Sequence, residues 1–135
     1  MTCLLDTTAL SDLMRENPAF DKHLAGLGET DLIAICPVVR GEIQFGLEKL
    51  EPGRRRLKLE TKAKQLFSVI HCEPIASAAA DHYAKVKVAR QKKGLTLDEN
   101  DLWIAACAPA SQATLVSRDG DFRQIDGLAV EDWTK

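Results

Sequence analysis

Acidic residues follow two of the short apolar runs in this sequence. Asp6 comes directly after residues 3–5, and Asp119 and Asp121 lie in the turn that follows residues 113–116. Short apolar runs of this kind predict buried β-strands, and an open α/β sheet binds its ligands at the carboxyl ends of its strands. We therefore expect these acids to meet at one end of a sheet, although each of them also suits a turn or a helix cap.

A further acid, Asp101, lies on the apolar face of a predicted helix. The positions that follow it at i+3, i+4 and i+7 are Ile104, Ala105 and Ala108. Burying an unpaired charge is costly, and a place in the first helical turn offsets only about 0.3–1 kcal/mol of that cost. We therefore expect a cation close to Asp101, with Asp98 or Asn100 capping the helix.

Glu42 supplies a fourth carboxylate. It lies beside the core position Ile43 in a helix that we expect to begin at Pro37. Carboxylates about 4 Å apart repel each other by roughly 4 kcal/mol at an effective dielectric constant of about 20. Proteins accept such a cluster mainly to hold a hard divalent cation, and Mg²⁺ takes oxygen ligands and often bridges to phosphate. The acids therefore predict metal-assisted cleavage of a phosphodiester bond by water.

Basic residues gather in two other segments. One covers residues 54–64 and begins with Arg54, Arg55, Arg56 and Lys58; the other covers residues 85–93. The net charge of −2 argues against a nucleic-acid partner, but the distribution of charge matters more than its sum. The first segment is either a surface that contacts RNA phosphates or a solvated helix face.

Strands and helices must alternate along the chain to position these side chains. The apolar runs predict strands at residues 3–5, 32–36, 68–72 and 113–116, with an edge strand near 128–130. Helices are expected after the capping residues Thr7 and Thr8, and at about 18–27, 37–50, 54–67, 75–93 and 98–108. This alternation predicts an α/β fold, a three-layer α/β/α domain around a mostly parallel sheet of four to five strands.

The composition is that of an ordinary globular protein. The chain has 135 residues, of which 45% are hydrophobic and 28% charged, and we expect one domain over residues 1–135. Its four cysteines form no C-x-x-C pair, so we expect free thiols and a reducing, cytoplasmic location. No stretch approaches the roughly 20 apolar residues of a membrane span, and no secretory signal is evident.

Other enzyme classes lack their motifs in this sequence. There is no glycine-rich dinucleotide or P-loop signature. The three histidines share no motif spacing. A haloacid-dehalogenase-type phosphatase would need a second Asp two residues after Asp6, where this chain has Thr8.

Four segments, taken in order, resemble the successive motifs of PIN-domain ribonucleases. They are residues 4–10, 39–43, 100–106 and 113–122, and the ending at residues 127–133 is also similar. The resemblance is strongest to the VapC-type toxins of toxin–antitoxin pairs, and it covers essentially the whole chain. The sequence departs from the family at Arg118, where many relatives have Asn; we expect Arg118 to pair with an acid or to contact phosphate.

This resemblance implies a function and a set of site residues. It implies an endoribonuclease that depends on Mg²⁺ or Mn²⁺, forms a homodimer and is inhibited by a VapB-type antitoxin. The implied metal ligands are Asp6, Glu42, Asp101 and Asp119, with Asp121 as the alternative fourth acid and Thr7 and Ser117 in support. A PIN nuclease of RNA processing and a non-catalytic PIN-like interaction domain remain alternatives.

Overall fold

The sheet is parallel throughout and has its first strand at its centre. The computed structural model describes all 135 residues, and its five strands are arranged in the order β3-β2-β1-β4-β5. Their bounds are β1 Thr2–Leu5, β2 Leu32–Ile35, β3 His71–Cys72, β4 Ala113–Val116 and β5 Val130–Glu131. All four strand pairings are parallel, which confirms the predicted sheet.

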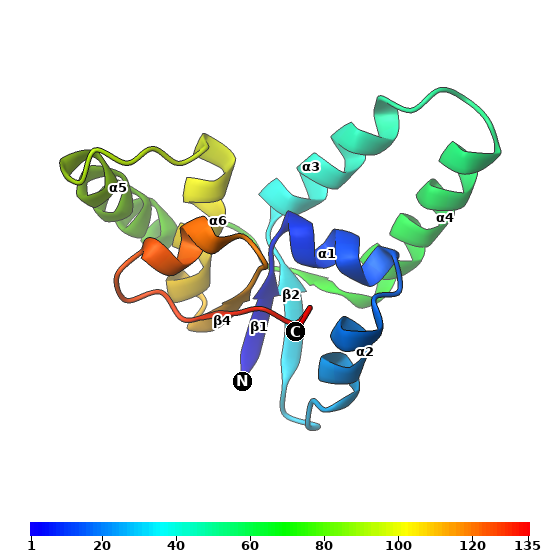
Figure 1. Cartoon of the computed structure of the whole chain (residues 1–135), viewed down its shortest axis with the longest axis horizontal. Helices are drawn as coiled ribbons and strands as arrows, with labels where there is room; N and C mark the ends of the chain where they lie inside the picture. The colour runs from blue at the N-terminus through cyan, green and yellow to red at the C-terminus, as the bar shows by residue number, and fades with distance from the viewer.

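Helices cover both faces of this sheet. They are α1 Thr7–Met14, α2 Pro18–Ala25, α3 Pro37–Glu48, α4 Arg54–Val69, α5 Ser77–Lys92 and α6 Glu99–Ala110, with a short 3₁₀ helix, η1, at Gly120–Gln124. Figure 1 shows α1 to α4 on one side of the sheet and α5 and α6 on the other. The predicted three-layer α/β/α architecture is therefore confirmed.

One continuous core of buried residues lies between these layers. Leu4 and Leu5 of β1, Ile35 of β2 and Leu115 of β4 are among its largest fully buried side chains. A parallel sheet that is covered on both faces needs apolar residues on both sides of each strand, and this explains why its strands appear in the sequence as short uninterrupted apolar runs. None of the helices is both long enough and apolar enough to span a bilayer.

The predicted strand at residues 68–72 is wrong in its first half. Helix α4 continues to Val69, and β3 contains only His71 and Cys72. No Gly or Pro interrupts the chain between Gly53 and Pro74, so the helix ends only where Ile70 takes an extended conformation. Val69 is apolar but exposed, and for this reason its residue type wrongly predicted a buried strand.

Candidate active site

Asp6 is a buried carboxylate that accepts hydrogen bonds at both of its oxygen atoms. It follows β1 and caps α1, a role that we expected of Thr7 or Thr8. Its Oδ1 accepts hydrogen bonds from the Ala9 backbone N–H at 2.8 Å and from Thr8 Oγ1 at 2.7 Å. The side chain is buried, and this burial raises the pKa of the Asp6 carboxyl group despite the hydrogen bonds that oppose the shift.

Ser117 connects Asp6 to the segment that follows β4. Its Oγ donates to Asp6 Oδ2 at 2.5 Å and accepts from the Asp119 backbone N–H at 3.0 Å. Ser117 is itself buried. One hydroxyl group therefore connects Asp119 to Asp6, and the parallel pairing of β1 with β4 brings these two segments to the same end of the sheet.

Asp119, and not Asp121, caps the short helix after β4. Asp119 Oδ1 accepts a hydrogen bond from the Asp121 backbone N–H at 2.9 Å, whereas the Asp121 side chain is exposed. In the sequence, the place of Asp121 directly before Phe122 favours Asp121 as the cap, and the structure shows the opposite arrangement. The extended backbone of Asp119, which is required of an N-cap residue, explains why the earlier acid takes this role. The ring of Phe122 is fully buried and anchors the segment.

Glu42 lies close to the start of α1. It is half-buried on α3, and its Oε1 accepts a hydrogen bond from Thr7 Oγ1 at 2.7 Å. The two hydroxyl residues that follow Asp6 thus hold two different acids, because Thr8 binds Asp6 and Thr7 binds Glu42. The supporting position of Thr7 was predicted. Thr8 was expected only as a helix cap. Its position two residues after Asp6 is the sequence feature that could have indicated its hydrogen bond to this acid.

Asp101 faces other acids and pairs with no basic side chain. Burial, followed by the negative charges of Asp98, Glu42, Asp119 and Asp6, raises the pKa of its carboxyl group to about 6. No Lys, Arg or His side chain pairs with Asp101, so the cation expected beside it is not a side chain of this protein. Asp98 caps α6 through the Asn100 backbone N–H, as predicted. Since the other charges surrounding Asp101 are negative, the site carries an unbalanced negative charge.

The four acids Asp6, Glu42, Asp101 and Asp119, which we call the acid cluster, suit a hydrated divalent cation. No three His, Cys, Asp or Glu side chains lie close enough together to enclose an ion alone. Mg²⁺ usually keeps several waters and takes only one or two carboxylates directly. The oxygen donors and the uncompensated charge beside Asp101 fit such an ion.

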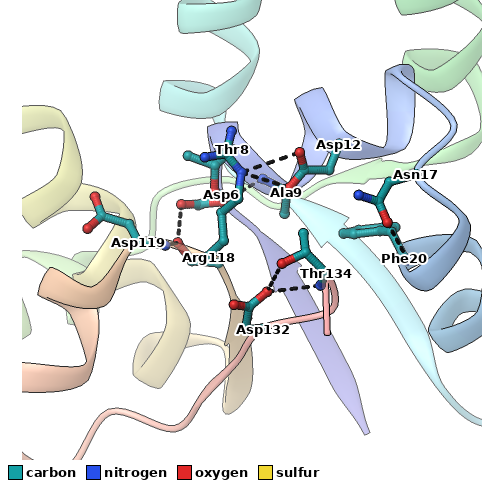
Figure 2. A network of polar contacts seen from close by, with 11 residues as sticks. Asp6, Thr8, Ala9, Asp12, Asn17, Phe20, Arg118, Asp119, Asp132 and Thr134 are labelled. Carbon is teal, nitrogen blue, oxygen red and sulfur yellow. Dashed lines mark hydrogen bonds and ion pairs between the residues drawn. The ribbon is translucent and has the colours of Figure 1, made fainter.

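An ion pair between a buried acid and a partly exposed arginine lies next to the acid cluster. Arg118 Nε donates to Asp12 Oδ2 at 3.0 Å and to Oδ1 at 3.3 Å, so Arg118 does pair with an acid as expected. Figure 2 shows its side chain passing from the end of β4 to Asp12 on α1. Asp12 was not among the sequence candidates. The signal for it is its helical spacing of three residues from the buried Ala9.

The basic residues at the start of α4 do not lie at the acid cluster. Figure 1 places the beginning of α4 at the far end of the α3–α4 pair, away from the carboxyl ends of the strands. Arg56 is engaged within the protein, since it contacts Glu48, Glu60 and the Leu50 carbonyl oxygen. The side chains of Arg54, Arg55 and Lys58 are exposed.

Comparisons with known proteins agree with this geometry. The family model described as "PIN domain" matches residues 3–128. The chain is 34% identical over 102 residues to Ribonuclease VapC5 of Mycobacterium tuberculosis, covering 73% of each protein, and 28% identical to Ribonuclease VapC2 of Rickettsia felis over the full length of both. It also resembles a crystal structure of VapBC2 from Rickettsia felis bound to a promoter DNA fragment, with a TM-score of 0.88, 27% identity and coverage of 98% and 99% of the two chains.

Proposed function

Because this chain belongs to the PIN-domain family and to its VapC group, we propose that it is a metal-dependent endoribonuclease and the toxin of a toxin–antitoxin pair. One observation carries the catalytic part of the proposal. The carboxyl group of Asp101 has its pKa raised by burial and by the charges of Glu42, Asp119 and Asp6. Four separate segments thus bring acids together without a neutralising side chain. Such an arrangement suits a divalent cation, because by itself it destabilises the fold.

The side chains around the acid cluster have distinct tasks in this proposal. Asp6, Glu42, Asp101 and Asp119 supply oxygen atoms to Mg²⁺, or to Mn²⁺ in its place. When bound, the cation would activate water and neutralise charge on the phosphodiester. Ser117 and Thr8 keep Asp6 in one orientation, and Thr7 does the same for Glu42. Removing such hydrogen-bonded partners of metal ligands commonly changes metal affinity by about 10–100-fold.

Cleavage of RNA by the purified protein tests this proposal. We expect cutting with Mg²⁺ or Mn²⁺, none with EDTA, and loss of cutting in Asp6→Asn and Asp101→Asn while both variants remain folded. Asp126→Asn is the matched control, because Asp126 is an exposed acid that pairs with Lys93 outside the cluster. Full activity in either cluster variant, or in EDTA, would contradict the four-acid mechanism.

The proposed partner is a VapB-type antitoxin. Support comes from the related structure, which is described as a VapBC2 complex, and from the negative charge of the acid cluster. An Arg or Lys from the partner would neutralise this charge in the absence of metal. We expect the product of an adjacent gene to co-purify and to suppress cleavage. Harmless expression of the free protein, without any co-purifying partner, would argue against the toxin assignment.

We also propose that the protein forms a homodimer. Several large apolar side chains stay exposed in the single chain, among them Phe45, Leu57 and Val69. Light scattering after size-exclusion chromatography should give twice the mass of the 14.9 kDa chain. A monomer at micromolar concentration would rule out this part of the proposal.

A further inference from the structure

Arg118 is held at only one of its three guanidinium nitrogens. Its Nε contacts both carboxylate oxygens of Asp12, at 3.0 and 3.3 Å, and neither Nη group has a protein partner. The Asp12 side chain is 8% exposed, whereas that of Arg118 is 44% exposed. An arginine that serves only an ion pair usually presents two parallel N–H groups to the carboxylate. Here the buried acid fixes the guanidinium and leaves four N–H donors free.

The position of Arg118 is unusual among the residues that follow the strands. The first three residues after each strand are 6–8, 36–38, 73–75, 117–119 and 132–134. Within these positions Arg118 is the only Lys or Arg. It lies between Ser117, which binds Asp6, and Asp119, which is an acid of the cluster. Figure 2 shows its side chain between Asp119 and Asp12.

An acidic site that cleaves RNA has an electrostatic difficulty. The acid cluster repels the phosphates of the substrate, and a bound cation compensates only at the phosphate that it contacts. The neighbouring phosphates need a cation that is fixed in place. Arginine suits this task because its planar fork matches two phosphate oxygens.

We propose that Arg118 binds an RNA phosphate that flanks the scissile one, with Asp12 acting as the positioning residue that holds the guanidinium toward the substrate. This inference rests on the proposed ribonuclease function. According to it, Arg118 is the positively charged side chain that binds substrate beside the acid cluster, and the Arg118–Asp12 pair takes part in substrate recognition. The exposed basic residues of α4 are not required for it.

The test compares Arg118→Gln with Arg118→Lys and with Arg123→Gln, a control that removes the charge of an exposed arginine from the same segment. The probe is a short fluorescein-labelled single-stranded RNA. Its binding is measured by anisotropy in EDTA over a range of salt concentrations, and its cleavage is measured with Mn²⁺. For Arg118→Gln we expect about tenfold weaker binding and a salt slope smaller by about 0.7, the value for one neutralised phosphate on a single strand.

The kinetic outcome separates substrate binding from a structural role. Arg118→Gln should raise KM about tenfold with kcat nearly unchanged, as expected when an interaction is equally strong in the ground and transition states. Arg118→Lys should recover the salt slope of the wild type, and Arg123→Gln should match the wild type throughout. A lower Tm of Arg118→Gln with unchanged KM and salt slope would overturn the proposal. If the wild type cleaves no RNA, the ribonuclease function fails, and the binding experiment in EDTA still decides the role of Arg118.

Discussion

The carboxyl group of Asp101 titrates near neutral pH because burial and the surrounding acids act in the same direction. Its pKa is raised from 3.8 to about 6 in the folded protein. Protonated Asp101 therefore stabilises the metal-free fold below about pH 4, and this contribution is lost as the pH rises through about 6. A cation bound at the acid cluster would reduce the repulsion that contributes to this loss.

The Asp101→Asn variant tests this linkage. In EDTA, we expect its Tm to exceed that of the wild type by an amount that grows between about pH 4 and pH 6.5, because the amide has no charge to repel its neighbours. Saturating Mn²⁺ should raise the Tm of the wild type more than that of the variant. The same Tm difference at both pH values would show that Asp101 is not under electrostatic strain. Other acids, such as Asp31 and Asp132, have lowered pKa values and so change the Tm in the opposite direction as the pH rises. Their contribution is the same in the variant and the wild type, and it therefore cancels in the Tm difference.

Asp119 and Asp121 are distinguished by what their side chains contact. Asp119 receives the backbone N–H of Asp121 and is placed by Ser117, whereas Asp121 is exposed. Asp119→Asn should lower the cleavage rate and weaken its response to Mn²⁺ with little change in Tm, since Asn also caps helices. Asp121→Asn should do less. Cleavage rate against Mn²⁺ concentration measures both, and a larger effect in Asp121→Asn would assign the fourth metal ligand to Asp121.

At the scale of elements, the sequence predicted which segments form helices and strands better than it predicted where they end. The apolar run of β1 and the core position Ile43 in α3 reflect burial, and the structure confirms both. The predicted end of α4 was wrong because Val69 is apolar but exposed, so its residue type does not reflect burial. That no basic side chain pairs with Asp101 was also unpredictable, since it depends on how separate elements pack.

Helix α5 contains a buried charge without an acidic partner. Arg90 is 5% exposed, and its Nε and Nη1 have no hydrogen-bond partner, while Nη2 donates to the Thr96 carbonyl oxygen at 2.9 Å. Burying a charged group without a partner is costly. We therefore expect Arg90→Met to raise the Tm, with Lys92→Met, at an exposed position of the same helix, as control. A lower Tm of Arg90→Met in thermal unfolding would show that the Arg90 guanidinium stabilises the fold despite its few hydrogen bonds.

The basic start of α4 divides into residues with structural contacts and residues without them. Arg56 contacts two acids and a carbonyl oxygen, and Arg55 is exposed. Arg56→Ala should therefore lower the Tm. If α4 contacts RNA, replacing Arg54, Arg55 and Lys58 by Ala should instead leave the Tm unchanged and flatten the salt dependence of RNA binding by about 0.7 for each phosphate that the helix no longer neutralises. An unchanged salt slope would identify this segment as a solvated helix face.

At the scale of the whole molecule, strand order explains why distant acids meet. The central strands β1 and β4 are neighbours, and they end at Leu5 and Val116, so Asp6 and the segment at 117–119 lie at the same edge of the sheet. Parallel strands and short apolar runs made this edge predictable from the sequence. The contacts that fix each acid were less predictable, because Thr7 reaches Glu42 across 35 residues of sequence and Ser117 reaches Asp6 across 111.

Direct binding of Mn²⁺ tests the central claim, which is that the acid cluster is a metal site. Free Mn²⁺ can be followed by electron paramagnetic resonance during titration of the RNA-free protein, for the wild type, Glu42→Gln, Asp101→Asn and the control Asp126→Asn. We expect the wild type and the control to bind Mn²⁺ equally well, and each cluster variant to bind it at least about tenfold more weakly, as the removal of a charged ligand requires. Equal Mn²⁺ affinity in all four proteins would contradict the account.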